Sequence, residues 1–227
     1  MDQRSLILCF SAALLAITSG VYGLKFLKKR NYLLAIEWLV VAFSSSNALN
    51  FFATGSPFSY GISHFLDAFS RGPGMPIITV VGLMAVTQGY KPSLRLDIVL
   101  LGGAVVGTIV LVSADFMTKI LPYFYVVMWA VLSIYLAYFV RKLLGAGQIF
   151  HSVTVTLALV SSQTIACIYD FYQIPGDEHN VVFNFYVLAL VTWSYLNVSI
   201  YYAYCALERA LERPALSANR RRRLVQG

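Results

Sequence analysis

One short stretch, residues 64–76, contains three side chains that can bind a charged ligand or exchange a proton: His64, Asp67 and Arg71. Asp67 and Arg71 are four residues apart, which on a helix allows a direct ion pair. The apolar run 77–86 directly follows this stretch, and an arginine at the edge of a hydrocarbon layer is costly unless it is paired or hydrated. We therefore expect Arg71 to contact a carboxylate or an anionic ligand at the end of a membrane segment.

The residues after Arg71 predict a broken helix, because Pro73 and Pro76 lie beside Gly72 and Gly74. Freed backbone groups are tolerated in a membrane only inside protein or beside a water-filled cavity. A helix that starts near Pro76 would point its first N–H groups, together with Arg71, at an anion. The alternative is a structural kink closed by an internal salt bridge.

Further polar side chains in apolar segments extend this candidate site. An outer layer is expected to hold His64, Asp67, Arg71, Gln163 and Asp170, with Asp170 as a second possible partner of Arg71. Polar membrane residues turn toward the bundle interior, so Asn47, Trp193 and Asn197 complete the expected ligand-binding set. Glu37 and His151 form an expected inner layer and are the candidates for proton coupling, because a buried carboxyl or imidazole can exchange a proton.

The composition places these residues in a membrane protein. Hydrophobic residues make up 59% of the chain and charged residues 12%, whereas a soluble domain has about 25% charged residues. A membrane helix needs about 20 apolar residues. Seven such spans fit, at 5–24, 32–53, 64–88, 96–114, 121–140, 150–173 and 182–206. The expected fold is an all-α seven-helix membrane domain over residues 1–208, with the third helix broken near its outer end, followed by a basic tail over 209–227.

The basic residues predict the orientation. Most of the 17 Lys and Arg residues follow spans one, three, five and seven, and only Arg4, Arg71 and Lys119 fall on the other side. The positive-inside rule then places the N-terminus outside and the C-terminus in the cytoplasm of a bacterial-type inner membrane, with the acidic loop 176–180 outside. The run Arg220–Arg223 is expected to bind anionic lipid headgroups.

Small residues indicate how the spans pack. Ala12, Ala16 and Gly20 recur every four residues in the first span, a spacing that lets helix backbones approach closely in lipid. Because spans one and four lack strongly polar residues, we expect them at the periphery. The seventh span is expected to continue as a helix as far as Pro214.

Several classes of function are excluded by residue type. The seventh span has no lysine, which excludes a covalent retinal. No catalytic residue, metal or cofactor is expected, since three histidines are too few and too scattered for a zinc site and the cysteines have no metal-ligand spacing. The basic residues flank membrane spans, which argues against a nucleic-acid partner.

The leading hypothesis is a membrane protein that binds and translocates a small polar or anionic solute, with proton coupling as an option. The runner-up is a receptor-like or accessory subunit that does not transport. A membrane enzyme that acts on lipid ranks third, so an enzymatic role is the less favoured one. The expected partners are membrane lipids and the small ligand, and both a homo-oligomer and a partner membrane subunit are compatible with the sequence.

Overall fold

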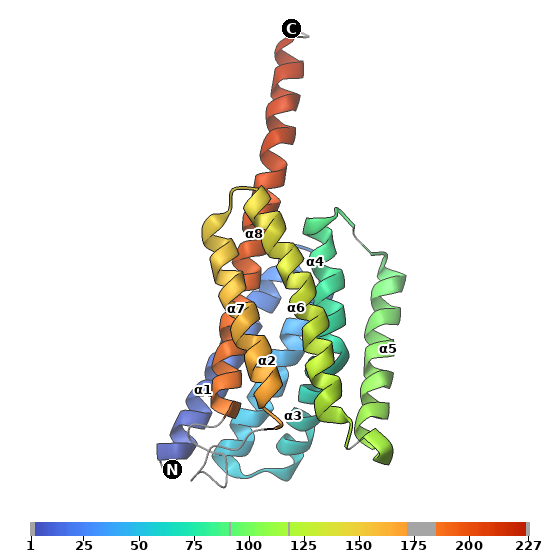
Figure 1. The fold of residues 1–227 in the computed structure, drawn as a ribbon, viewed down its shortest axis with the longest axis vertical. Helices are drawn as coiled ribbons and strands as arrows, with labels where there is room; N and C mark the ends of the chain where they lie inside the picture. Colours follow the sequence, from blue (N-terminus) through green and yellow to red (C-terminus); the bar gives the residue numbers. More distant parts are fainter. Residues whose placement is uncertain (1–2, 91, 118, 172–184, 226–227) are drawn as a thin grey trace.

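The chain forms a bundle of long helices in a computed structural model, shown in Figure 1. The structure describes residues 3–90, 92–117, 119–171 and 185–225; within these ranges it describes all side chains except those of 3–4, 185 and 213–225. No strand occurs in the described ranges. The helices are α1 (Gln3–Lys28), α2 (Tyr32–Thr54), α3 (Pro57–Phe69), η1 (Ser70–Thr79), α4 (Val80–Thr87), α5 (Leu94–Ser113), η2 (Asp115–Met117), α6 (Leu121–Gly145), α7 (Ile149–Ile168) and α8 (Phe185–Val225).

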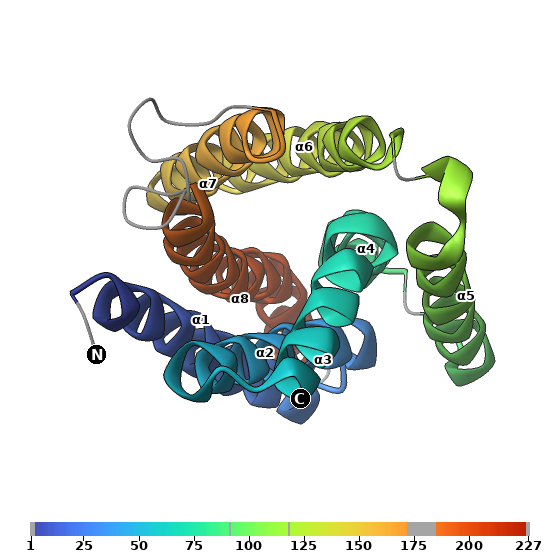
Figure 2. The ribbon, with the colours of Figure 1, turned by 90° about the horizontal axis from the view of Figure 1, so that it is seen from below.

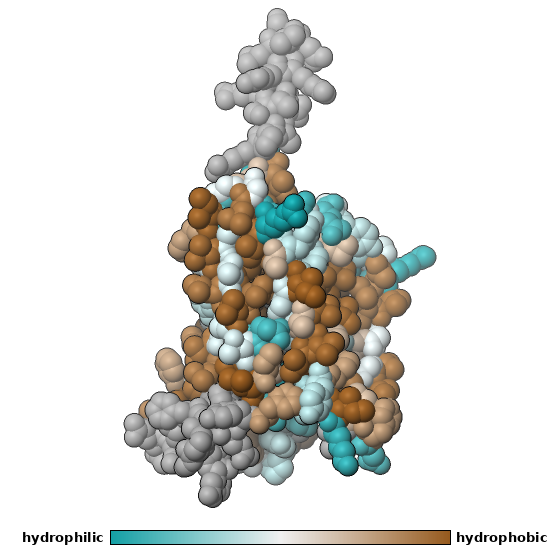
Figure 3. All heavy atoms as spheres, in the orientation of Figure 1, coloured by the Kyte–Doolittle hydropathy of each residue, from teal (hydrophilic) through white to brown (hydrophobic). Residues whose placement is uncertain are grey.

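Among the described residues, six helical segments are long and apolar enough to cross a membrane: α1, α2, the joined segment Pro57–Thr87, α5, α6 and α7. The first half of α8 adds a seventh long segment rich in apolar residues. Many large apolar side chains on these helices are exposed, including Phe10, Ile98 and Ile134. Brown, hydrophobic atoms accordingly cover much of the face drawn in Figure 3. These features fit a helical membrane bundle.

The third segment begins at Pro57, seven residues before the expected start at His64. The Ser56 side chain accepts a hydrogen bond from the Ser59 N–H, and Pro57 occupies the first turn. Ser followed by Pro is a typical helix start, so this signal was present in the sequence. The other helices lie close to their expected spans, except that α6 extends to Gly145 and α8 continues through Pro214 to Val225. Residues 182–184 of the seventh span and the loop 176–180 lie outside the described residues.

The expected break in the third helix is replaced by a π-helical segment, which corrects that prediction. η1 covers Ser70–Thr79 and contains Pro73 and Pro76, and it joins α3 to α4 without an interruption. A proline ring clashes with the carbonyl four residues earlier in an α-helix. The wider π turn relieves that clash, and π segments occur often at functional sites.

The two helices expected at the periphery, α1 and α5, differ in how much they contact the rest of the bundle. α5 lies at the edge of the bundle in Figure 2, next to α3 and η1. α1, in contrast, packs along both α2 and α8. The small residues of α1 allow this contact: a Cβ on Gly23 would lie 3.1 Å from Trp38 Cβ. The Asn197 side chain of α8 also donates a 2.8 Å hydrogen bond to the Ser19 hydroxyl, so α1 does carry an interior polar contact.

The end of the bundle where α1 finishes is tied together by polar contacts, and we call it the basic end. Asn31 caps α2 and donates a 2.8 Å hydrogen bond to the Gly82 carbonyl. Lys29 forms an ion pair with Glu208 of α8. Burial is the largest single influence and would lower the pKa of Lys29, but the hydrogen bond to Glu208 and the electrostatic attraction of Cys205, Glu208 and Tyr201 together raise that pKa. These contacts hold the α1–α2 turn against α4 and α8.

Candidate functional site

Arg71 lies near the centre of a charged cluster and is 7% exposed. Its Nη2 forms an ion pair with Asp170 Oδ2, and its Nη1 lies 3.7 Å from Asp67 Oδ2. The two partners that the sequence left as alternatives therefore both contact Arg71. Because a buried guanidinium is stable only when it is paired, the two carboxylates explain how Arg71 is accommodated.

Two tyrosine rings contact the guanidinium as well. Its central carbon lies 4.1 Å from the ring centre of Tyr125 and 4.6 Å from that of Tyr169. Such cation–π contacts stabilise a cation by about 0.5–2 kcal/mol, more when water is excluded. Arg71 is therefore fixed in position by residues of α3, α6 and the turn after α7.

A central cavity of about 30 Å³ lies beside Arg71, between η1 and helices α1, α2, α3, α6 and α8. Its walls include Asp67, Ser70, Arg71, Trp193 and Asn197. This volume is enough for one or two water molecules, and it is well below the size of a typical site for a small organic ligand.

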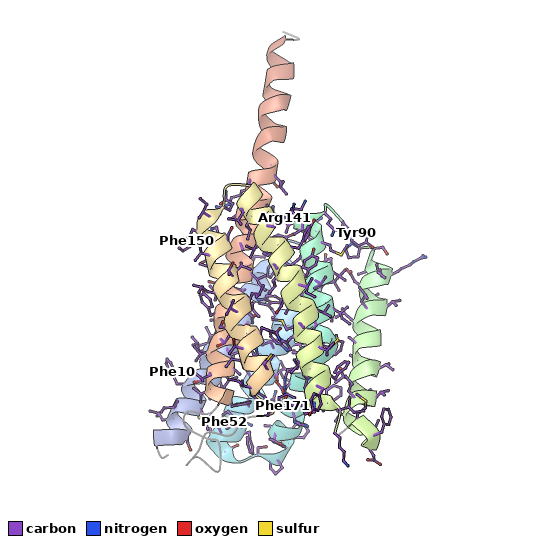
Figure 4. The ribbon with its side chains drawn as sticks, viewed as in Figure 1. Phe10, Phe52, Tyr90, Arg141, Phe150 and Phe171 are labelled. Atoms are coloured by element: carbon purple, nitrogen blue, oxygen red, sulfur yellow. The ribbon has the colours of Figure 1, made fainter. Side chains whose placement is uncertain are left out.

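A larger space, the vestibule, has a volume of about 490 Å³. It is lined by Leu8, Ala48, Phe51, Phe52, Tyr60, Ser63, His64, Asp67, Tyr169 and Tyr186. Tyr60 and His64 are exposed, so the vestibule reaches the surface of the described part of the molecule. Phe52 is at the end of the bundle opposite Arg141 in Figure 4. The vestibule and the central cavity share Ala48, Ser63, Asp67 and Tyr186, so the two spaces adjoin.

Three polar atoms on the wall of the central cavity have no hydrogen-bond partner within the described residues: Ser70 Oγ, Trp193 Nε1 and Asn197 Oδ1. Asn197 is 0% exposed, and its amide nitrogen is already bonded to Ser19. Buried polar groups usually have a partner. A cavity with one donor, one acceptor and one hydroxyl that are not bonded to protein suits water or a polar ligand group.

Glu37 is fully buried and faces η1. The Ser70 hydroxyl lies beside it, yet neither carboxyl oxygen has a partner with hydrogen-bond geometry among the described residues. A Cβ placed on Gly74 would lie 2.5 Å from Glu37 Oε2, so only glycine permits this approach. Burying an ionised carboxylate without a partner is costly, and both oxygens of Glu37 are in this position.

Glu37 and His151, which form the expected inner layer, both lie near the start of their helices, α2 and α7. His151 lies in the first turn of α7 beside Phe150, with 5.4 Å between the ring centres, and no contact between it and Glu37 occurs in the described part of the chain. Glu37 instead lies next to Ser70, the neighbour of Arg71 in sequence.

Two further predicted ligand residues do not line either space. Gln163 accepts a 2.8 Å hydrogen bond from Ser133 and donates one to Cys167, so it joins α7 to α6. Asn47 donates a 2.9 Å hydrogen bond to the carbonyl of Phe43 in its own helix. His64, by contrast, lies on the vestibule wall and stacks on Tyr60.

Sequence reasoning missed the contributions of Ser70, Tyr125, Tyr169 and Tyr186. A signal existed for Tyr169, because it directly precedes Asp170. It also existed for Tyr125, which lies one helical turn before Trp129, a second buried aromatic residue of α6. Comparison of the chain with protein-family models, with curated proteins and with solved structures finds no match.

Proposed function

We propose that this chain is an integral membrane protein that binds a small polar solute in the vestibule and passes it toward the central cavity. The single observation that carries this proposal is that two adjoining spaces meet at Asp67, beside the ion-paired Arg71. Ligand sites of transporters lie near the bilayer midplane beside irregular helices. η1 is such an irregular element, and its Ser70 and Arg71 line the central cavity.

In this proposal the Arg71 cluster separates the two spaces. Rearrangement of the contacts of Arg71 with Asp67 and Asp170 opens the way to Ser70, Trp193 and Asn197. Glu37, which has no polar partner beyond the neighbouring Ser70, takes up and releases the coupling proton. The chain lies in a bacterial-type inner membrane with its N-terminus outside, so that the vestibule faces the exterior and the basic end faces the cytoplasm. The helical segment containing Arg220–Arg223 then contacts anionic lipid.

A flux assay in reconstituted vesicles tests this function. Purified protein is incorporated into liposomes, and the uptake of labelled cationic, zwitterionic and anionic solutes is measured with and without a pH gradient. We expect uptake of one class that Arg71→Ala abolishes and that Glu37→Gln uncouples from the pH gradient. Arg95→Ala is the matched control, because Arg95 is an exposed residue of α5 that lines neither space.

The second candidate is a receptor-like or accessory subunit that binds a solute in the vestibule without transporting it. The small volume of the central cavity, about 30 Å³, favours this role. Binding of a solute without uptake of any class, together with co-purification of a membrane partner, would replace transport by this function.

A further inference from the structure

The charges around the vestibule favour a cationic ligand over the anion expected from the sequence. Arg71 already contacts two carboxylates, Asp67 and Asp170. An anion would have to displace one of them and leave that carboxylate unpaired in a largely buried site, which is costly. Asp67 is the weaker partner, with its nearest oxygen 3.7 Å from Arg71, and it lines both spaces. With two carboxylates and one guanidinium, this cluster has an excess of negative charge.

The walls of the vestibule are aromatic, and their rings form a nearly continuous series. Tyr60 stacks on His64 with 5.8 Å between ring centres, and it lies 5.0 Å from Phe51. Phe51 lies 5.7 Å from Phe52, which in turn is 5.8 Å from Tyr186.

The series of aromatic rings continues from the vestibule toward the central cavity. Tyr186 lies 6.2 Å from Tyr169, and Tyr169 lies 6.5 Å from Trp193 on the wall of the central cavity. Trp193 stacks on Trp129 with 5.9 Å between ring centres. The aromatic wall therefore leads from the surface of the vestibule past Asp67 to the central cavity.

Aromatic rings around one carboxylate suit an organic ammonium group better than a metal ion. The faces of Tyr, Phe and Trp rings attract cations, and quaternary ammonium ligands are recognised by cages of such rings. Hard metal ions instead take six or more oxygen ligands, and the described residues contain no cluster of three or more His, Cys, Asp or Glu side chains that could hold a metal. The volume of about 490 Å³ is within the range of sites for small organic ligands.

We infer that the vestibule binds a small organic cation, with Asp67 as its counter-charge and the rings of Phe51, Phe52, Tyr60 and Tyr186 as its walls. This inference rests on the vestibule of the proposed function and names its ligand class. The ammonium group lies beside Asp67, on the side away from Arg71. Movement of the cation inward brings it to Trp193 and Asn197.

The test compares three probes of nearly equal shape and different charge: choline, the neutral 3,3-dimethyl-1-butanol and the anionic 3,3-dimethylbutyrate. Their binding to the detergent-purified full chain is measured by isothermal titration calorimetry. We expect choline to bind about 10-fold or more tightly than the neutral probe, since cation–π and ionic contacts contribute about 1–2 kcal/mol. The anion should bind most weakly.

Two variants and two controls locate the binding. Asp67→Asn is expected to remove the preference for choline over the neutral probe, and Phe52→Leu to weaken choline binding several-fold while keeping an apolar wall. Asp115→Asn removes a carboxylate from the exposed η2 turn, and Phe10→Leu removes a ring that is 71% exposed; neither should change the affinity. If Asp67→Asn does not fold, the comparison of Phe52→Leu with Phe10→Leu still tests whether choline binds in the vestibule.

Equal binding of choline and the neutral probe, tightest binding of the anion, or no binding of choline would each overturn the inference. These outcomes are distinct from a failure of the proposed function. Choline that binds but is not taken up by vesicles leaves the ligand class intact and contradicts transport. Uptake of an anion without choline binding contradicts only the ligand class.

Discussion

The guanidinium of Arg71 has more partners than a surface arginine normally finds. Two carboxylates and two tyrosine rings contact it, from α3, from α6 and from the turn after α7. Removing one partner of a buried charge leaves the other uncompensated, whereas removing both can be nearly neutral. The cluster therefore contributes to stability as a unit. The changes in the free energy of unfolding caused by substituting its members should not be additive.

A double-mutant cycle on Arg71 and Asp170 tests this coupling. Asp170→Asn is expected to lower the free energy of unfolding by about 3 kcal/mol, near the lower limit for breaking a buried ion pair, because the Asp170 side chain is 22% exposed. Adding Arg71→Met should recover part of the loss, because it removes the guanidinium and leaves only Asp67, whose side chain is 28% exposed, without its cation. Unfolding in detergent is followed by tryptophan fluorescence, with the exposed Asp115→Asn as the control. A double variant as unstable as the sum of both single losses would contradict the coupling.

At the scale of elements, η1 determines how closely α2 approaches the third segment. Gly74 has no side chain where Glu37 lies, and Gly82 has none where Leu34 lies: an added Cβ would be 2.5 Å from Glu37 Oε2 and 2.6 Å from Leu34 Cγ. The two glycines are eight residues apart and face the same helix. Close packing of α2 against η1 and α4 therefore depends on both.

Gly74→Ala tests this dependence. The added methyl group must push Glu37 or the whole of α2 away, and overpacking of this kind costs about 1–3 kcal/mol. The loss is measured as a decrease in the free energy of unfolding. In the background of Glu37→Ala the same substitution should cost much less, since the clashing carboxyl is gone. Gly103→Ala on α5, where a Cβ would meet nothing within 4 Å, should leave stability unchanged; a similar loss there would assign the effect to the helix backbone.

These elements also show what the sequence could predict. Long apolar runs predicted the helices, because a membrane helix must satisfy its backbone groups internally and present apolar side chains. The contact of Arg71 with Asp170 was foreseeable, since both residues lie near the same end of their spans. The π segment was not, because Gly and Pro normally interrupt a helix. The approach of Glu37 to Gly74 depends on the rotation and tilt of two helices, and local sequence patterns do not specify either.

At the scale of the whole molecule, ion pairs lie toward both ends of the described part of the bundle. The cluster around Arg71 lies toward the end where α1 begins, and the Lys29–Glu208 pair lies at the basic end. Figure 1 shows α1 starting at the lower end and α8 finishing beyond the upper one. This arrangement fits the proposal that the two ends of the chain lie on opposite sides of a membrane.

Reporter fusions test the proposed orientation. A C-terminal green fluorescent protein should fluoresce and a C-terminal alkaline phosphatase should be inactive, because the former folds in the cytoplasm and the latter outside it. An N-terminal epitope tag should be accessible to antibody on spheroplasts without permeabilisation. The physical reason is the retention of basic loops in the cytoplasm. An active C-terminal phosphatase, or an N-terminal tag that needs permeabilisation, would reverse the orientation or change the number of crossings.

The length of α8 has a mechanical consequence. Its 41 residues extend over about 60 Å at about 1.5 Å per residue, roughly twice the thickness of a hydrocarbon core of about 30 Å. Trp193 and Asn197, on the wall of the central cavity, lie in the half within the bundle, and Val225 lies about 40 Å further along the same rod. A slight tilt of α8 about Asn197 would therefore displace the far end of the helix by many ångströms. In the proposed function, Asn197 is also where the solute would arrive.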